Sequence, residues 1–511
     1  MKKLQDLNDA QWQAVTHDSG HLLIVAGPGT GKTHTLTYRI ARLTARLTNG
    51  QRVLAVTFTN KAADQMEERL EQKGVDAGKF WAGTFHRFCV QLLRQHAQHT
   101  DLPNNFQIAL PRQIAALAKD IWPAKTMAQR QAVLENISWI KSTRLVLDPD
   151  EDFKAYHRFL RGKGLIDFDD ILREALILLE NNDEAADATR RQYPFVCVDE
   201  YQDINIVQNA LLKILSRDGV LLTAIGDPDQ SIYGFRGSEV KLFHRFQKDF
   251  PNGTRLYLNE NYRSAPNLLQ ASGQVIGQFH LVAKIHSEGR LVVHEAATDR
   301  AEAEYIAHEI EKMVGGLSLL SAFVRRHGYV PRTFGDIAVL YRLNAQKTCL
   351  IQALEHLGIP YQASDAVKPQ AGGDDDALLR AAEEAVDYNV EKVSLLTLHA
   401  AKGLEFPVVF IAGCEEHLLP LDAVGTTGDG EEERRLFYVG MTRAKEFLYL
   451  TRAKEFLFLT HAERRQLFGK GMFNGPSPFL ADIEEDLKAY EAGRRKKIKP
   501  VLAPDQQMKL F

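Results

Sequence analysis

Short runs of apolar and β-branched residues alternate along this chain with longer segments that have a helical pattern. Six such runs are HLLIVAG at 21, RVLAVTFT at 52, YPFVCVDE at 193, GVLLTAIGD at 219, DIAVLYR at 336 and PVVFIAGC at 407. Near-continuous hydrophobic runs of this kind are typical of parallel strands that crossover helices bury on both faces. The pattern therefore predicts an α/β fold with parallel sheets.

Three stretches depart from this alternation. Between about 91 and 190 the sequence has helical patterns and little strand signal, which predicts a helical insertion in the first α/β unit. The stretch 364–390 is a Gly- and Asp-rich linker followed by a short helix. At 442–459, TRAKEFLYL is followed at once by TRAKEFLFL. Because a nine-residue shift turns an apolar set to the wrong face of a strand, one copy is expected to turn back or loop out.

The strongest chemical signal is AGPGTGKT, between the run HLLIVAG and a helical pattern. Glycines let backbone amides close around a triphosphate, and a helix N-terminus adds positive potential. The Lys of this pattern reaches the β- and γ-phosphates, and the hydroxyl of the last residue binds magnesium. A nucleotide-binding loop is therefore predicted at Ala26, Gly27, Pro28, Gly29, Thr30, Gly31, Lys32 and Thr33. The strict nucleotide-binding pattern has Gly where this chain has Ala26. The alternative interpretation is an ordinary Gly-rich turn between a strand and a helix.

A second signal, VCVDEYQD, ends the predicted strand YPFVCVDE. Phosphoryl transfer needs a group that holds magnesium and a group that orients the attacking water. Asp199 is predicted as the magnesium ligand and Glu200 as the base, with Asp203 as the next candidate. An isolated Asp-Glu pair is usually only surface, but this one follows a buried strand in a chain with a nucleotide-binding loop.

Composition limits the remaining possibilities. Of 511 residues, 45% are hydrophobic and 25% charged, which is typical of a soluble protein with roughly two to four domains. The longest apolar stretches are too short to span a bilayer, so no membrane segment is expected. Four scattered cysteines without a CxxC pair favour the reducing cytoplasm. With a net charge of -3, a nucleic-acid partner would be held by a local groove.

Further motifs follow in order: LNDAQ at 7, TFTNKAA at 57, GTFH at 83, GDPDQSIYGFRG at 226, LNENYRS at 258, LTLHAAKGLEF at 396 and YVGMTRAK at 438. With the two signals above, the chain from about 4 to 465 resembles the UvrD/Rep-like superfamily 1 DNA helicases. The resemblance implies two RecA-like P-loop domains, 1–262 and 263–485, with ATP and Mg²⁺ between them. The insertion of the first domain is 91–190, that of the second is nearly absent, and 486–511 is a flexible basic tail.

The resemblance also implies roles for individual residues. Six would face the nucleotide: Gln11 and Tyr262 at the adenine, Glu405 near the ribose, Gln230 at the γ-phosphate, and Arg263 and Arg443 as arginine fingers from the second domain. Guanidinium groups that close on the phosphates stabilise the transition state, although each arginine taken singly fits a salt bridge equally well. Only the first repeat copy follows Tyr-Val, so Arg443 is the expected finger and Arg452 a bystander.

For DNA, aromatic and polar residues stand at predicted strand ends: Phe58, Thr59, Asn60, His86, Tyr233, Phe235 and His399. Stacking on bases tolerates any sequence, which suits a motor. Many relatives have tryptophan at the position of Phe235, and the alternative for Phe58 is a place in the hydrophobic core. Single-stranded and duplex DNA are the implied partners.

The implied function is ATP-dependent 3′ to 5′ translocation and unwinding in DNA repair or replication. Because 364–390 replaces a large helical insertion, poor unwinding is expected from the isolated chain. The alternatives are a translocase that strips proteins from single strands, and a nucleotide-gated scaffold on a replication partner. The end of the chain, Gln507–Phe511, resembles peptides that dock on the bacterial sliding clamp, and a tail that folds back on its own domain is the alternative.

Overall fold

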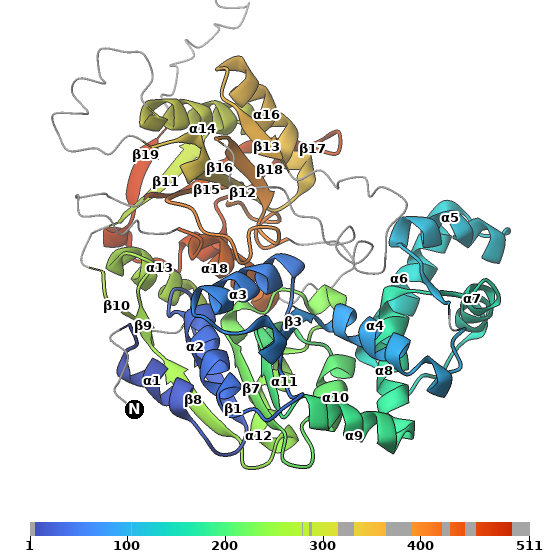
Figure 1. Ribbon diagram of the computed structural model, residues 1–511. Helices are drawn as coiled ribbons and strands as arrows, with labels where there is room; N and C mark the ends of the chain where they lie inside the picture. The colour runs from blue at the N-terminus through green and yellow to red at the C-terminus, as the bar shows by residue number, and fades with distance from the viewer. Residues whose placement is uncertain are drawn as a thin grey trace, which may run out of the picture.

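The chain forms two lobes, each built on a parallel sheet (Figure 1). The computed structural model describes residues 6–103, 105–277, 280–285, 289–314, 332–363, 391–421, 430–444 and 456–492. We call the sheet that begins with β1, with its helices, the first lobe, and the sheet that begins with β11, with its helices, the second lobe. Two helices, α13 (Pro266–Ile276) and α18 (Gly430–Met441), lie where the lobes meet.

The strands of the first sheet are all parallel and lie in the order β3-β2-β6-β7-β1-β8. Their bounds are β1 Leu22–Ala26, β2 Val53–Thr57, β3 Phe80–Thr84, β6 Phe195–Val198, β7 Leu221–Gly226 and β8 Thr254–Leu258. The two faces of the sheet carry different helices: α1 Asp9–Thr16, α2 Lys32–Thr44 and α3 Asn60–Gln72 on one, and α10 Ile206–Leu215, α11 Val240–His244 and α12 Phe246–Asp249 on the other.

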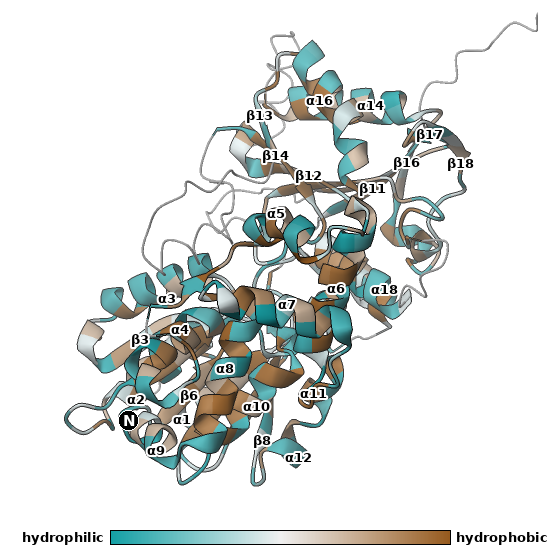
Figure 2. Ribbon diagram, turned by 90° about the vertical axis from the view of Figure 1, so that its right-hand side faces the viewer, coloured by the Kyte–Doolittle hydropathy of each residue, from teal (hydrophilic) through white to brown (hydrophobic). Residues whose placement is uncertain are grey.

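Alternate residues of one strand therefore enter different cores. Leu22 and Ile24 of β1 pack among α1, α2 and α3, whereas Leu23 packs into the core on the opposite face. Burial on both faces explains why the strand runs are apolar at successive positions. Figure 2 shows the same arrangement, with hydrophobic helix sides turned inward and hydrophilic sides outward.

The predicted helical insertion lies between β3 and β6 and extends to the right of the first sheet in Figure 1. Its helices are α4 Phe85–Gln95, α5 Pro111–Ile121, α6 Met127–Thr143, α7 Glu151–Gly162, α8 Phe168–Asn181 and α9 Asp183–Gln192. Two short strands, β4 Gln107–Ile108 and β5 Leu165–Ile166, pair in parallel within it. The outer helices have their own small hydrophobic core, and α4 and α8 share the core of the first sheet.

The second sheet is also parallel, in the order β13-β14-β12-β15-β16-β11-β19. Its strands are β11 Arg290–Ala296, β12 Ile337–Tyr341, β13 Tyr361–Ala363, β14 Val393–Thr397, β15 Val408–Ala412, β16 Phe456–Ala462 and β19 Ala489–Ala492. Helices α14 (Asp299–Val314) and α16 (Lys347–His356) cover one face, and α13 and α18 cover the face toward the first lobe. The α/β fold and all six strand runs predicted from the sequence are confirmed.

Smaller strands complete the chain. β9 (Glu260–Asn261) and β10 (Val282–Ala283) form a short parallel pair between the lobes. β17 (Arg464–Leu467) and β18 (Lys470–Phe473) form an antiparallel hairpin beside the second sheet.

The structure corrects the start of the predicted tail. Residues 489–492, assigned to a flexible basic tail from the sequence, form β19, which pairs in parallel with β11 from Val292 to Glu295. A four-residue strand at the edge of a sheet depends on the neighbouring strand for its hydrogen bonds, so the local sequence gave little signal for it. Residues 493–511 and the predicted linker and helix at 364–390 lie outside the described residues.

The duplicated segment contributes to two separate elements. Arg443 and Ala444 of the first copy follow α18, and Ala444 makes an isolated parallel bridge with Phe406. β16 begins at Phe456, in the second copy, and lies between β15 and β11. The prediction that one copy loops out or turns back falls on 445–455, which lie outside the described residues.

Candidate functional site

The loop between β1 and α2 adopts backbone conformations that glycine allows. Gly29 and Gly31 have φ values of 69° and 81°, in the left-handed region. A Cβ atom at Gly29 would lie 2.5 Å from the Cβ of Arg263, so the loop is also closely packed. Lys32 begins α2, and its Nζ donates to the carbonyl oxygens of Ala26 and Gly27 at 3.2 and 3.4 Å. An ammonium group beside the amides of a helix N-terminus is a geometry that binds phosphate.

Gln11 and Tyr262, both predicted at the adenine, are brought together beside this loop. Gln11 Nε2 donates to the carbonyl of Thr30 at 3.0 Å, and the backbone amide of Tyr262 donates to the carbonyl of Gly29 at 2.8 Å. Asn8 joins them, because its Oδ1 accepts from the Gln11 amide at 2.7 Å and its Nδ2 donates to the Tyr262 hydroxyl at 2.9 Å. The Tyr262 side chain is 44% exposed and borders a cavity of about 440 Å³. An aromatic face and an amide thus lie next to the loop.

Two carboxyl groups with different proton affinities follow β6. Burial raises the pKa of Asp199 to about 7, and the neighbouring Glu200 carboxylate adds to this shift. Burial also acts to raise the pKa of Glu200, but the ammonium groups of Lys32 and Lys402 hold that pKa below its ordinary value. Glu200 has a φ of 51°, which is rare for a residue with a Cβ, and its amide donates to Asp199 Oδ1 at 2.9 Å. Adjacent groups whose pKa values are pushed apart are common in catalytic sites.

Two arginines add positive charge opposite these carboxyl groups. Arg263, which follows β9, forms an ion pair with Glu405 at 2.6 Å between Nη2 and Oε2. Arg443 is buried, and it donates to the carbonyls of Val439 at 2.9 Å and Leu404 at 3.2 Å. Burial and the nearby Arg263 lower the pKa of Arg443 to about 10. Because the two like charges repel, an anion bound between them would be favourable.

Most of these groups line one cavity of about 730 Å³ between the lobes. Gln11 lines the smaller cavity beside it, and Asp199 is in the lining of neither cavity. The predicted site residues that line it are Gly27, Gly29, Gly31, Lys32, Thr33, Glu200, Gln230, Tyr262, Arg263, Glu405 and Arg443. Its lining also includes Arg69 and Lys73 of α3 and its C-terminal cap, which the sequence analysis missed. Arg69 and Lys73 are four residues apart, which puts both cations on one face of the helix. This spacing was the sequence signal that could have identified them.

Thr33 and Asp199, the predicted magnesium ligands, have oxygen donors of the kind that this cation prefers. In the part of the chain that the structure describes, no three His, Cys, Asp or Glu side chains gather into a metal-binding group. Magnesium in phosphoryl-transfer sites typically uses one or two carboxylates together with phosphate and water oxygens. A cation beside Asp199 would also offset the repulsion from Glu200, so the residues fit magnesium.

Lys402, which follows β14, contacts the first lobe through a pair that the sequence analysis missed. Its Nζ donates to Asp203 Oδ1 at 2.8 Å, to Asp203 Oδ2 at 2.6 Å and to the carbonyl of Gln230. The side chains of Lys402 and Asp203 are 6% and 0% exposed. Because both carboxylate oxygens of Asp203 bind Lys402, Glu200 is the better placed of the two candidate bases.

Four of the predicted DNA-binding residues form one aromatic cluster from both lobes. Phe58 and Tyr233 stack with ring centroids 5.0 Å apart, and Phe235 and His399 meet edge to face at 5.4 Å. Tyr233 lies 6.1 Å from Phe235, and the Arg236 guanidinium lies 5.5 Å from each of these two rings. Phe235 is 58% exposed. An exposed ring beside a guanidinium, backed by further rings, has the chemistry of a base-stacking platform.

The other predicted DNA-binding residues have different contacts. His86 contacts Phe168 of α8 edge to face at 5.6 Å, and burial lowers the pKa of His86 to about 4. Thr59 caps α3, with its hydroxyl oxygen accepting from the Ala62 amide at 3.2 Å, and Asn60 is buried as the first residue of α3. The structure therefore does not bring His86 together with the four aromatic residues.

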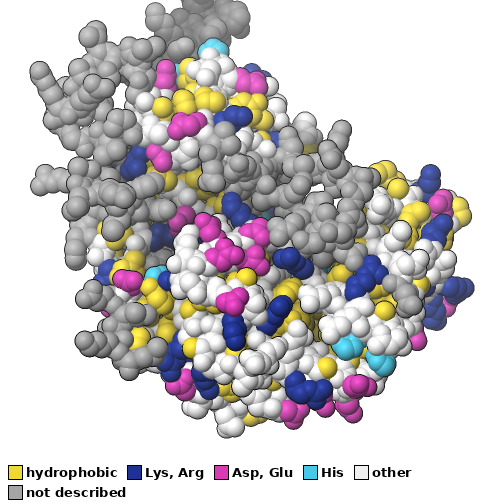
Figure 3. Space-filling model, viewed as in Figure 1, with side chains coloured by type: hydrophobic (Ala, Val, Ile, Leu, Met, Phe, Trp, Pro, Cys, Tyr) yellow, Lys and Arg dark blue, Asp and Glu magenta, His cyan; other side chains and the backbone are white. Residues whose placement is uncertain are grey.

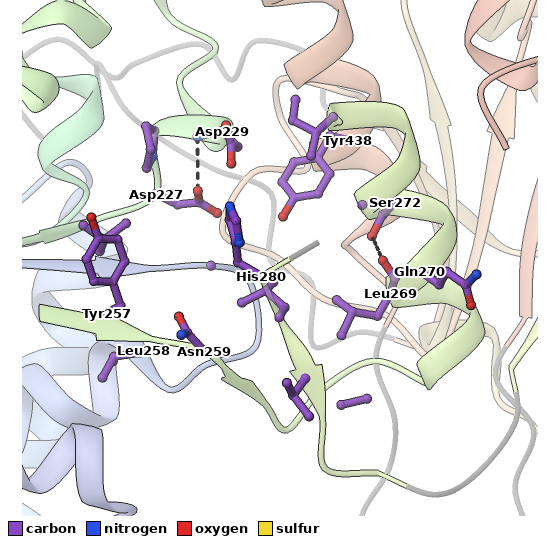
Figure 4. Close-up of a pocket in the computed structure, with 18 of the residues that line it drawn as sticks. Asp227, Asp229, Tyr257, Leu258, Asn259, Leu269, Gln270, Ser272, His280 and Tyr438 are labelled. Atoms are coloured by element: carbon purple, nitrogen blue, oxygen red, sulfur yellow. Dashed lines mark hydrogen bonds between the residues drawn. The ribbon is translucent and has the colours of Figure 1, made fainter. Parts of the chain in front are cut away.

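A second cavity, of about 600 Å³, shares Gly27 with the nucleotide cavity (Figure 4). Asp227 and Asp229 lie on one side of it, and Tyr438 of α18 lies across from them. Burial raises the pKa of Asp229 to about 7, and the Asp227 carboxylate adds to the shift. Of the predicted nucleotide-binding residues, this second cavity has Gly27 alone in its lining, whereas the cavity of about 730 Å³ is lined by Gly27, Gly29, Gly31, Lys32, Thr33, Tyr262 and Glu405. The latter is therefore the better candidate for ATP.

The surface agrees with the low net charge. On the face in Figure 3, Lys and Arg side chains are interspersed with Asp and Glu, and a group of acidic side chains lies near the centre. Among the described residues, no helix is both long enough and apolar enough to cross a bilayer.

Two family models match consecutive parts of the chain. The model of the UvrD/REP helicase N-terminal domain matches residues 7–251, and that of the UvrD-like helicase C-terminal domain matches 256–368 and 374–455. The chain belongs to the UvrD/Rep helicase family. This confirms the resemblance drawn from the motifs.

Individual relatives of the family align with nearly the whole chain. The ATP-dependent DNA helicase PcrA of Staphylococcus epidermidis is 28% identical over 679 aligned positions, which cover 99% of this chain and 90% of that protein. The ATP-dependent DNA helicase PcrA of Staphylococcus aureus is 28% identical over 676 positions, with 98% and 89% covered. Since this chain has 511 residues, these UvrD/Rep-family relatives contain segments that it lacks.

Proposed function

We propose that this chain is an ATP-driven motor that translocates 3′ to 5′ on single-stranded DNA and unwinds duplex DNA, in the cytoplasm, in repair or replication. One observation carries the proposal. Gln230 lines the nucleotide cavity, and Tyr233 and Phe235, three and five residues later, belong to the aromatic cluster. A shift of this short segment at the phosphates therefore moves the base-stacking rings. Membership of a helicase family supports the same conclusion, and the direction comes from the resemblance.

For hydrolysis, we propose that ATP binds between the domains 1–262 and 263–485. The amides of the loop after β1 and Lys32 hold the β- and γ-phosphates, and Glu200 orients the attacking water and accepts its proton. Arg263 and Arg443 turn from their present partners to the γ-phosphate and stabilise the charge of the transition state. Magnesium, held by Thr33 and Asp199, would neutralise part of the phosphate charge.

For the nucleoside, we propose that Tyr262 stacks on the adenine and Gln11 binds its edge. The cavity of about 440 Å³ beside both side chains supports this assignment. Glu405 lies near the ribose, and its ion pair with Arg263 would then link ribose binding to the position of one finger. Domain closure on ATP and hydrolysis would become one event, because the contacts come from different parts of the chain.

The first test is the ATPase rate with and without an unstructured single-stranded oligonucleotide. We expect the rate to rise at least tenfold with DNA, and Lys32→Ala to abolish turnover in both conditions, because Lys32 holds phosphate in the transition state. The matched control is Lys213→Ala, an exposed lysine whose nearest carboxylate, Asp249, is 3.5 Å away. Turnover that is indifferent to DNA would instead support a nucleotide-gated scaffold on a replication partner.

A translocase that strips proteins from single strands and unwinds little is a second candidate. The alignment with the Staphylococcus epidermidis relative favours this candidate. Its 679 positions exceed the 511 residues of this chain, so the relative contains segments that this chain lacks. We propose that part of what this chain lacks is a duplex-binding insertion at 364–390, a segment outside the described residues. A strand-displacement assay run beside a protein-stripping assay separates the two candidates. Efficient unwinding of long blunt duplexes by the isolated chain would rule out the second.

We also propose that Gln507–Phe511, outside the described residues, binds the replication sliding clamp. A short peptide of this kind buries a few apolar anchors in a preformed groove and tethers the motor to DNA at modest affinity. A fluorescent peptide of the last eleven residues, titrated with clamp, is expected to bind. A peptide carrying Leu510→Ala and Phe511→Ala is the control. Equal affinity of the two peptides would end the idea.

A further inference from the structure

We propose that Lys402 is a positioning residue that transmits DNA binding at the aromatic cluster to the hydrolytic groups, through its ion pair with Asp203 and its hydrogen bond to Gln230. The inference rests on the proposed function, in which DNA stimulates hydrolysis. It adds a residue pair between the lobes that acts on catalysis without contacting ATP or DNA.

One ammonium group contacts three functional segments. Lys402 Nζ binds both carboxylate oxygens of Asp203, which lies three residues after Glu200 in the turn that follows β6. It also donates to the carbonyl of Gln230, in the turn that reaches the nucleotide cavity. The same nitrogen lies 5.1 Å from the ring centroid of Tyr233, in the aromatic cluster. A displacement of any of these segments therefore changes the contacts of the other two.

Backbone hydrogen bonds connect the segment that bears Lys402 to the cluster. The Lys402 amide donates to the carbonyl of His399 at 3.3 Å, and the Ala401 amide donates to the carbonyl of Thr397 at 3.1 Å. His399 contacts Phe235, so a base that stacks there meets a residue three positions from Lys402. Three positions further on, Glu405 pairs with Arg263 in the nucleotide cavity.

Other contacts hold the lobes together without Lys402. Arg435 Nε of α18 donates to the carbonyl of Ser231 at 2.8 Å, and the Gly234 amide donates to the carboxylate of Glu432 at 3.1 Å. These contacts bind the backbone of the segment that joins Gln230 to Phe235. Loss of Lys402 therefore leaves the interface between the lobes in place, and its main effect falls on the geometry and charge around Glu200.

The charge of the pair has a predictable direction of effect on Glu200. The charged and titratable groups that act on Glu200 or respond to it are Lys32, Lys402, Arg443, Asp199, Asp203, Asp227 and Tyr233. The Lys402 ammonium, together with that of Lys32, holds the pKa of Glu200 below its ordinary value. Loss of Lys402 therefore also changes the charge around the proposed base.

The experiment compares Lys402→Met, Asp203→Asn and the double variant in the full chain. We expect the ratio of DNA-stimulated to basal turnover to fall at least tenfold in each single variant, with kcat falling more than the half-saturating DNA concentration rises. Because the two residues act as one unit, the double variant should lose no more than a single one. Lys213→Met, another lysine near a carboxylate, is the matched control and should keep the wild-type ratio.

The outcomes of this experiment distinguish failure of the positioning role from failure of the proposed function. If DNA does not stimulate the wild-type chain, the proposed function is wrong. If DNA stimulates the wild type and Lys402→Met keeps the same ratio, the positioning role is wrong. A purely structural role would lower the melting temperature together with basal and DNA-stimulated turnover and leave their ratio unchanged, and that result would also overturn the inference.

Discussion

The nucleotide cavity and the aromatic cluster are both assembled at the ends of parallel strands from two lobes, but they are held in opposite ways. In the cavity, Lys32 and Arg443 donate to backbone carbonyls and Arg263 is held by Glu405. In the cluster, rings pack on rings, and Phe235 is 58% exposed. Directional hydrogen bonds fix charges to a small volume, whereas ring contacts permit sliding.

This difference corresponds to what each region is proposed to bind. Triphosphate chemistry needs cations and a base at fixed places, because misplacement by about 1 Å can cost about a hundredfold in rate. A motor on DNA needs contacts that any base satisfies and that can be released. The comparison predicts large effects from single changes in the cavity and graded effects from changes in the cluster.

The largest effect is expected at Arg443. Arg443→Ala should lower ATP turnover by about 10³-fold, because an arginine finger is worth roughly 10³–10⁵ in kcat. Arg452→Ala, the same change in the second repeat copy, is the matched control and should leave turnover within about twofold. Both variants are measured by steady-state ATPase with saturating DNA. Loss of activity in Arg452→Ala with activity kept in Arg443→Ala would reverse the assignment.

Glu200→Gln should lower turnover by about 10²-fold or more and leave nucleotide binding intact, because removal of a general base typically costs 10²–10⁴. Binding is measured with a fluorescent ATP analogue and hydrolysis by phosphate release. Normal hydrolysis in this variant would mean that another group is the base. The ion pair of Asp203 with Lys402 argues against Asp203 in that role.

Single changes in the aromatic cluster should have smaller, graded effects on DNA binding. Phe235→Ala should weaken single-stranded DNA binding by about 5- to 150-fold, since one stacking contact is worth roughly 1–3 kcal/mol. Phe235→Trp should strengthen it, because the indole offers a larger face. Phe468→Ala, at the exposed hairpin turn between β17 and β18, is the control for the loss of a solvent-exposed ring. Equal DNA affinity of Phe235→Ala and wild type in fluorescence anisotropy would remove this ring from the DNA site.

The smallest expected effect is in the pH dependence of magnesium binding. The pKa of Asp199 is raised to about 7, so a proton competes with magnesium for this carboxylate below neutral pH. The magnesium concentration for half-maximal ATPase should rise about tenfold from pH 8 to pH 6, as follows for one competing proton. Asp199→Asn should remove this dependence together with most activity. A half-maximal concentration that is constant over this range would place the metal on other ligands.

Much of the fold and the core of the site followed from local sequence patterns. Continuous apolar runs predicted six of the thirteen strands in the two described sheets. The motifs AGPGTGKT and DEYQD predicted several residues that line the cavity, among them Lys32, Thr33 and Glu200. Local patterns work here because a buried parallel strand and a glycine-rich loop each depend on residues that are adjacent in sequence. The same reasoning missed Arg69, Lys73 and Lys402, whose importance arises only from what lies opposite them.

Sequence alone could not decide which copy of the duplicated segment forms a strand. FLYLTRA at 447–453 and FLFLTHA at 456–462 have nearly the same strand pattern. In the structure the second copy forms the strand β16. Its Phe458 is buried and stacks on Phe410 with ring centroids 4.3 Å apart, and its His461 is buried at the end of the strand. The first copy would bring the Tyr449 hydroxyl and the Arg452 guanidinium to these positions, and a buried polar or charged group costs free energy unless it is paired.

The sequence by itself identified six strands, the glycine-rich loop with the phosphate-binding pattern and the arginine that follows α18. Tertiary structure alone decided which repeat copy completes the second sheet, and that Ala489–Ala492 adds a strand to its edge. It also decided that Lys402 and Asp203, 199 positions apart, form a buried pair. The reason is physical: periodicity and turn chemistry are local, whereas the free energy of a buried charge or an edge strand depends on the partner that the fold brings to it.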